Sequence, residues 1–143
     1  MVPKSCESFH FRLGSFRCLV ANDGNSPYPD PAQIFFVNAP KEQLKDVLRE
    51  HKIDLSSWKE YVSPYQSLLV ETGQHRVLID TGEGNLEPTV GNLIANLRAE
   101  GVMPEDLDVV VLTHAHPVLI GGYSNREGKP AFPNARYVTW KNE

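Results

Sequence analysis

Two histidines separated by one residue are the clearest candidates for chemistry in this chain. His114 and His116 follow an apolar run, Val109–Leu112, which predicts a short strand buried on both faces. The loop that leaves the carboxyl end of such a strand is the usual place for a site in an α/β domain. Neutral imidazole nitrogens are good zinc ligands, so the spacing makes His114 and His116 candidate ligands of one metal ion.

The residues around these histidines resemble a family signature. Segment 113–122 reads Thr-His-Ala-His-Pro-Val-Leu-Ile-Gly-Gly, and segment 78–82 reads Leu-Ile-Asp-Thr-Gly. The two segments are similar to motifs of the metallo-β-lactamase superfamily, namely Thr-His-x-His-x-Asp-His and an aspartate that closes a strand before a glycine turn. The similarity runs from about Ser67 to the end of the chain. It implies an αββα sandwich in which zinc-bound hydroxide attacks an ester or lactone carbon, with His114 and His116 as metal ligands.

Asp80 has two interpretations at this stage. The resemblance implies a residue behind the metal site, whose carboxylate accepts the remaining N–H of a histidine and so fixes its tautomer. The local sequence favours an aspartate that caps the turn into Thr81 and Gly82. Both roles can hold together, and Asp80 is the one candidate for a supporting catalytic residue.

The motif departs from the family at two adjacent positions. Val118 and Leu119 stand where the family has aspartate and histidine, so the ligands that this loop would offer to a second zinc are replaced by aliphatic side chains. The family's domain is also roughly twice as long as this chain, within ordinary domain sizes. Its later ligands are therefore expected beyond Glu143. We expect one weak zinc site at most and little or no activity from the chain alone.

Two functions from different classes remain open. The first is the N-terminal half of a zinc-dependent hydrolase for an ester or lactone, related to the lactonase and organophosphate hydrolase branches. The second is a metal-free structural or interaction module, natural or engineered, that keeps the half-fold. Half of a layered sandwich exposes an apolar sheet face, which predicts a homo-oligomer or a complementing C-terminal half as partner. Zinc binding discriminates between the two functions.

The elements that must position the site follow from hydrophobic spacing. This spacing predicts an α/β fold with a mixed sheet and helices on one face. In it, a strand, a helix and a strand form a βαβ unit before the histidines. The expected elements are a hairpin over 9–20, an exposed loop over 22–31, a short strand over 34–37, a helix after Pro40, strands over 67–71 and 76–80, a helix over 90–97, the strand at 109–112 and a strand over 136–140.

Composition limits the remaining possibilities. The chain has 143 residues and a net charge of −4, which fits one partial domain over 1–143 without a basic stripe for nucleic acid or an anionic membrane. A small-molecule partner stays open. The start of the chain lacks the pattern of a signal peptide, so cytoplasmic residence is expected. Cys6 and Cys18 form no CxxC pair and are expected to be reduced.

Overall fold

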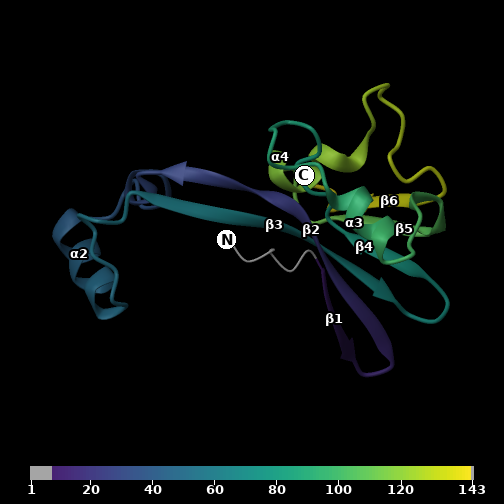
Figure 1. The fold of residues 1–143 in the computed structure, drawn as a ribbon, viewed down its shortest axis with the longest axis horizontal. Coiled ribbons are helices and arrows are strands. Elements are labelled where there is room, and N and C mark those ends of the chain that lie inside the picture. The colour runs from purple at the N-terminus through teal and green to yellow at the C-terminus, as the bar shows by residue number, and fades with distance from the viewer. Residues whose placement is uncertain (1–7, 143) are drawn as a thin grey trace. The chain divides into compact units, whose positions relative to one another are not determined.

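The structure is a computed structural model that describes residues 8–142. Contacts divide it into two compact units: the described residues up to Asn25 with those from Pro64 on, and Ser26–Ser63. The elements, labelled in Figure 1, are β1 (Ser8–Leu13), β2 (Phe16–Pro29), α1 (Pro31–Phe35), α2 (Lys41–Glu50), β3 (Glu60–Glu71), β4 (Arg76–Ile79), α3 (Leu93–Ala99), η1 (Pro104–Asp106), β5 (Val109–Leu112), α4 (Pro117–Ile120), η2 (Gly121–Tyr123) and β6 (Arg136–Thr139). None of these helices is long and apolar enough to cross a bilayer.

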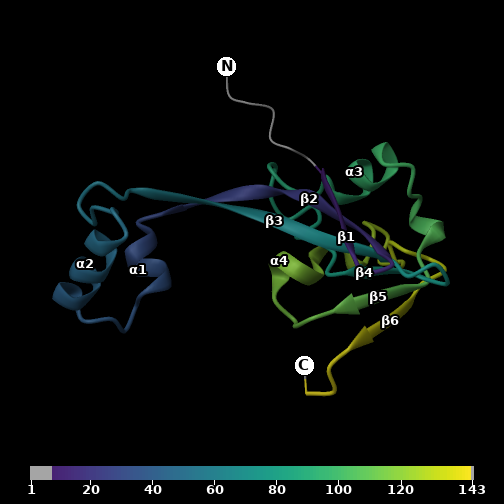
Figure 2. The same ribbon diagram turned by 90° about the horizontal axis from the view of Figure 1, so that it is seen from below.

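Within the described residues, one mixed sheet takes its strands in chain order from β1 to β6. β1 pairs antiparallel with β2, and β3 with β4, which confirms both predicted hairpins. β4, β5 and β6 are parallel neighbours, and α3 lies between β4 and β5 in the chain, as the predicted βαβ unit requires. Figure 2 shows β5 and β6 pointing the same way, with α4 beyond the end of β5. The predicted α/β class is confirmed.

The core lies between α3 and one face of the sheet. The register aligns Leu69, Leu78 and Val110 across β3, β4 and β5, and none of them is more than 1% exposed. Leu97 of α3 belongs to the same cluster and is fully buried. Burial of each such side chain contributes about 1.5–3 kcal/mol. The carboxyl ends of β4 and β5 are therefore held by a well-packed base. α3 itself begins later than the apolar spacing predicted, since Val90 precedes it.

The opposite face of the sheet is aliphatic but only partly covered. Val111 belongs to this face and is half-buried, whereas its neighbour Val110 faces α3. The prediction that this strand is buried on both faces is therefore wrong, because a single helical layer covers only one side. The row that contains Val111 is completed by the aligned residues of the neighbouring strands, Leu68, Ile79 and Val138.

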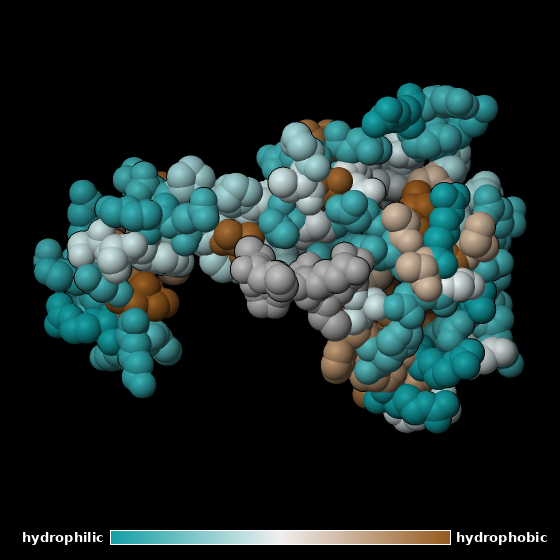
Figure 3. Space-filling model, in the orientation of Figure 1, coloured by the Kyte–Doolittle hydropathy of each residue, from teal (hydrophilic) through white to brown (hydrophobic). Residues whose placement is uncertain are grey.

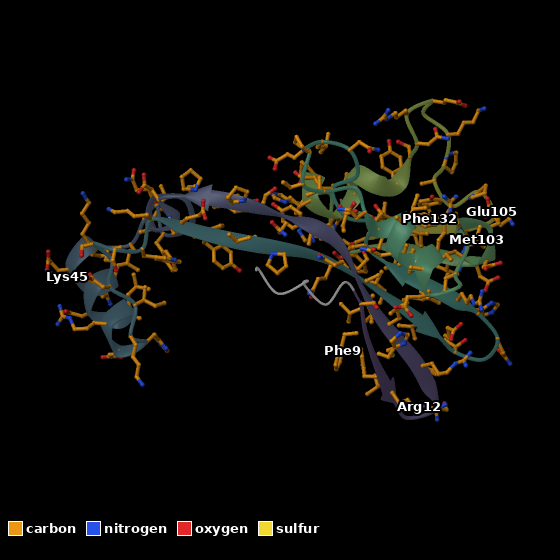
Figure 4. All side chains as sticks on the ribbon, viewed as in Figure 1. Phe9, Arg12, Lys45, Met103, Glu105 and Phe132 are labelled. Atoms are coloured by element: carbon orange, nitrogen blue, oxygen red, sulfur yellow. The ribbon has the colours of Figure 1, made fainter. Side chains whose placement is uncertain are left out.

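The hairpin of β1 and β2 also exposes large apolar side chains. Phe9 and Leu13 of β1 are 61% and 68% exposed. Figure 3 shows one of several apolar patches at this hairpin, and in Figure 4 the side chain of Phe9 projects away from the strands. Cys18 of β2 is buried and unpaired, while Cys6 lies outside the described residues.

The predicted exposed loop over 22–31 is wrong for most of its length. β2 continues through this segment to Pro29, and Asp23 is only 1% exposed. The prolines and glycine here weaken strand propensity, but bonds from α3 and the residue before it outweigh that preference: the side-chain amides of Asn92 and Asn96 donate to the carbonyl oxygens of Asp23 and Asn22 at 3.1 and 2.6 Å.

The unit Ser26–Ser63 is helical, and the short strand predicted over 34–37 is wrong. Pro31 opens α1 instead, at a position where its fixed φ suits the first helical turn. Phe35 at the end of α1 contacts the rings of Tyr28 and Tyr61, with centroids 5.3 and 5.8 Å away. α2 confirms the helix predicted after Pro40, and its apolar stripe is buried at Leu44 and Leu48.

Candidate metal site

Asp80 lies where β4 ends, beside the end of its parallel neighbour β5. Its backbone takes the left-handed conformation, with φ of 60°, and its N–H donates to the carbonyl oxygen of Val111 at 2.8 Å. Aspartate tolerates this conformation better than most residues. The turn brings the carboxylate to Thr113, the first residue after β5. Two strand ends that are far apart in sequence are thereby joined at one edge of the sheet.

A chain of hydrogen bonds runs from Asp80 through Thr113 to His114. The Thr113 N–H donates to Oδ1 of Asp80 at 2.9 Å, and Thr113 Oγ1 lies 3.0 and 2.9 Å from Oδ1 and Oδ2. Nδ1 of His114 lies 3.1 Å from the same hydroxyl. Because a carboxylate only accepts, the hydroxyl proton goes to Asp80, and the hydroxyl oxygen accepts from Nδ1–H of His114. This arrangement leaves the lone pair on Nε2 of His114.

The structure thus modifies the role expected of Asp80. The resemblance implied a direct bond from a histidine N–H to this carboxylate, whereas Thr113 stands between them. The sequence interpretation missed this bridging position of Thr113. Its signal was present in the sequence, since a residue with a hydroxyl directly precedes the first histidine at the end of a predicted strand.

His114 and His116 are brought together as the spacing predicted. Their ring centroids are 6.0 Å apart with 34° between the ring planes, and both side chains are exposed. Two imidazoles fit a zinc ion as two of its ligands, but a catalytic zinc normally has three from the protein. Residues 8–142 contain no cluster of three histidine, cysteine, aspartate or glutamate side chains that would hold a metal. The described residues therefore offer an incomplete donor set.

Val118 and Leu119 lie in α4, directly after His116, and both side chains are half-buried. Neither aliphatic side chain can bind a metal. The backbone of α4 is nevertheless firmly attached to the loop after β4: Thr81 N–H and Thr81 Oγ1 donate to the Leu119 carbonyl oxygen at 2.7 and 3.1 Å. A Cβ on Gly121 would lie 2.1 Å from the carbonyl oxygen of Glu83, so only glycine allows this close packing. At these two positions, aliphatic side chains stand on a tightly held backbone.

Glu83 is a buried carboxyl group beside this loop that the sequence interpretation also missed. Its side chain is 8% exposed, and its Oε2 atom is buried without a hydrogen-bond partner among the described residues. Burial raises the pKa of Glu83 above its ordinary value, the neighbouring carboxylates of Glu87 and Asp23 raise it further, and His116 opposes the shift. This burial could not be predicted from the sequence, because the composition of the glycine-rich loop 81–85 predicts exposure.

Comparison with known proteins agrees with this geometry. Residues 61–117 match the sequence model of the metallo-beta-lactamase superfamily. AidC, described as a dizinc quorum-quenching lactonase in complex with a homoserine product, shares 27% identity and a TM-score of 0.78 over 91% of this chain. The hydrolase AbOPH of the beta lactamase superfamily shares 26% identity and a TM-score of 0.75 over 92%. A probable metal-dependent hydrolase from Staphylococcus aureus, at 24% identity and a TM-score of 0.72 over 93% of this chain, shows the same fold. This chain spans 43% of the first two structures and 50% of the third.

Proposed function

We propose that this chain, which belongs to the metallo-β-lactamase superfamily, carries the first zinc-binding loop of a hydrolase and that His114 and His116 are the two ligands it supplies. The observation that carries the proposal is the hydrogen-bond chain Asp80–Thr113–His114. It leaves Nε2 of His114 free to bind a metal, and a hydrogen bond that orients a ligating histidine in this way is typical of zinc sites.

The residues of the proposed zinc-binding loop and the aspartate behind it have separate roles in this function. Asp80 and Thr113 hold the imidazole of His114 in one tautomer, and His116 lies beside it as the second nitrogen donor. A zinc ion bound there would supply a water of lowered pKa and polarise the bond under attack. The substrate class that we propose is a lactone or ester. It is supported by the similarity to AidC, a lactonase at 27% identity.

We further propose that the loop retains one zinc half-site and has lost the other. Val118 and Leu119 replace the donors of the family signature, whereas AidC is described as dizinc. Zinc binding by two protein nitrogens is weaker than by three or four, so occupancy and hydrolysis should both be impaired relative to a complete site.

The test is zinc stoichiometry by elemental analysis. The purified chain is stripped with a chelator, reloaded with zinc and desalted, and the His114→Ala, His116→Ala double variant is treated in parallel. His51→Ala, His75→Ala is the matched control, since both of those histidines are exposed and lie outside the loop. We expect about one zinc per chain, lost in the loop variant and retained in the control. Zinc no higher than in the loop variant would overturn the proposal and leave a metal-free module.

A further inference from the structure

Asp23 of β2 is a buried carboxylate at the back of the proposed site. It is 1% exposed, and its two carboxylate oxygens accept from different segments: Oδ2 from the N–H of Glu83 at 2.9 Å and Oδ1 from the N–H of Leu93 at 3.0 Å. Its carbonyl oxygen accepts from the backbone and side-chain nitrogens of Asn92 at 2.8 and 3.1 Å. A carboxylate is costly to bury unless it is well bonded, so these bonds explain why this residue stays inside.

The two donors to the carboxylate belong to different segments, one to the start of α3 and one to the loop after β4. Leu93 is the first residue of α3, and the N–H groups of a helix's first turn have no partner within the helix. Glu83 lies in the loop after β4, which continues from Asp80. Asp23 therefore ties the start of α3 to the loop that leads away from the hydrogen-bond chain at His114.

The loop passes directly over Asp23 and then meets α4. A Cβ on Gly82 would lie 2.4 Å from Cγ of Asp23, so there is room only for glycine above the carboxylate. On its other side the loop bonds to the segment after the histidines: the N–H of Gly122 donates to the carbonyl oxygen of Gly82 at 3.2 Å, and Thr81 donates to Leu119. Contacts are thus continuous from Asp23, through residues 81–83, to the helix that begins directly after His116.

We propose that Asp23 is a positioning residue for the metal site: it fixes the loop 81–83 and, through α4, the orientation of the segment that carries His116. The inference rests on the proposed function for its consequence in zinc binding. The positioning of the loop, however, can be measured in the metal-free chain, so the two ideas can fail separately.

The experiment compares Asp23→Asn with the wild-type chain. The asparagine keeps the size of the side chain but presents an NH₂ group to one of the two N–H donors, so one bond becomes a donor–donor contact. Two measurements are made: hydrogen exchange of backbone amides in the metal-free chain, and zinc affinity by competition with a chelator. Asp30→Asn is the control, because Asp30 is exposed and its side chain does not cap α1.

We expect exchange at Glu83, Leu93 and Gly122 to rise by about tenfold or more, as the opening free energy of this region falls. The core amide of Val110 should remain unchanged. Zinc affinity should fall on the order of tenfold, as for other residues that orient metal ligands. The control should change neither quantity.

Each contrary result has a distinct meaning. If the wild-type chain binds zinc and Asp23→Asn binds it equally well, the inference is overturned while the proposed function stands. Where the wild-type chain binds no zinc, the proposed function fails and the exchange at Gly122 alone decides the inference. Faster exchange at Glu83 and Leu93 without any change at Gly122 would reduce Asp23 to a local structural role and also overturn it. If Asp23→Asn fails to fold, Asn92→Ala removes only the bond from its side chain and should produce the same pattern with smaller changes.

Discussion

The two halves of the loop after β5 are built differently. The half next to the strand is tied by side chains, since Asp80 fixes Thr113 and Thr113 fixes His114. The half in α4 and η2 is tied by backbone, since the Leu119 carbonyl oxygen, Gly121 and Gly122 pack on residues 81–83, while Val118 and Leu119 offer no donor side chains. Under the proposed function, the comparison teaches that a metal site can lack ligands while the scaffold that would place them stays intact. Three variants test this view.

Removal of the hydroxyl from the side-chain-tied half should have the largest effect. Thr113→Val keeps the shape of the side chain but leaves Nδ1 of His114 without its acceptor, so the tautomer is no longer fixed. We expect zinc affinity, measured by chelator competition, to fall on the order of 10- to 100-fold. Thr139→Val, at an exposed position at the end of β6, is the matched control. Unchanged affinity in Thr113→Val would mean that the hydrogen-bond chain does not serve the metal.

Restoration of metal-binding side chains to the half in α4 should raise zinc affinity, by less than the loss expected for Thr113→Val. Val118→Asp combined with Leu119→His returns the family's residue types to positions whose backbone is already held by Thr81. We expect zinc binding to become roughly tenfold tighter, because additional ligands complete the coordination. The measurement is the same competition titration. An affinity equal to that of the wild-type chain would show that α4 no longer presents these positions to the metal.

Substitution of Glu83, the buried carboxyl group beside α4, should produce the smallest effect. That effect is on the stability of the fold rather than on zinc binding. Burial, with Glu87 and Asp23 nearby, raises the folded-state pKa of Glu83 above its ordinary value of 4.5, with His116 opposing. The stability that this group contributes is therefore fully present below pH 4.5 and is lost as the pH rises through the folded-state pKa. Glu83→Gln carries no charge at any pH, so the variant should gain stability relative to the wild-type chain at pH 8 but not at pH 4.

The check is urea unfolding of the metal-free chain at both pH values. Glu105→Gln serves as the control, because Glu105 is exposed and lies in η1, on another part of the surface. If the difference between Glu83→Gln and the wild-type chain is the same at pH 4 and pH 8, the carboxyl is not held in the environment described above.

The sequence predicted those parts of the molecule that depend on local pattern. The hairpins, α2 and the parallel pair of β4 and β5 follow from hydrophobic spacing, and the pairing of His114 with His116 follows from their separation. The turn at Asp80, directly after β4, also follows from the local sequence, while the role of its carboxylate in a metal site stays a prediction. Each of these elements can be recognised from a few neighbouring residues, and the helix between β4 and β5 implies their parallel pairing.

The features that it did not predict depend on partners far along the chain. Asp23 lies in a segment whose composition is typical of a loop, and only its bonds to Glu83 and Leu93 make it part of a buried strand. α1 replaced a predicted strand because Phe35 packs between two tyrosines that the short apolar run does not contain. The partial exposure of Val111 depends on which layers cover the sheet, and residue pattern alone does not reveal that.

The bonds of Asp23 also bear on the order in which the chain folds. β4, α3 and β5 contact one another through segments that are close in sequence, whereas Asp23 is separated from Glu83 by 60 positions and from Leu93 by 70. Contacts of long sequence separation are slow to form, because loop-closure entropy must be overcome first. We therefore expect the βαβ unit to fold early. The loop 81–83 should become ordered last, when the N-terminal hairpin joins the sheet. The Val110 amide would then gain protection before that of Glu83 in pulse-labelled refolding.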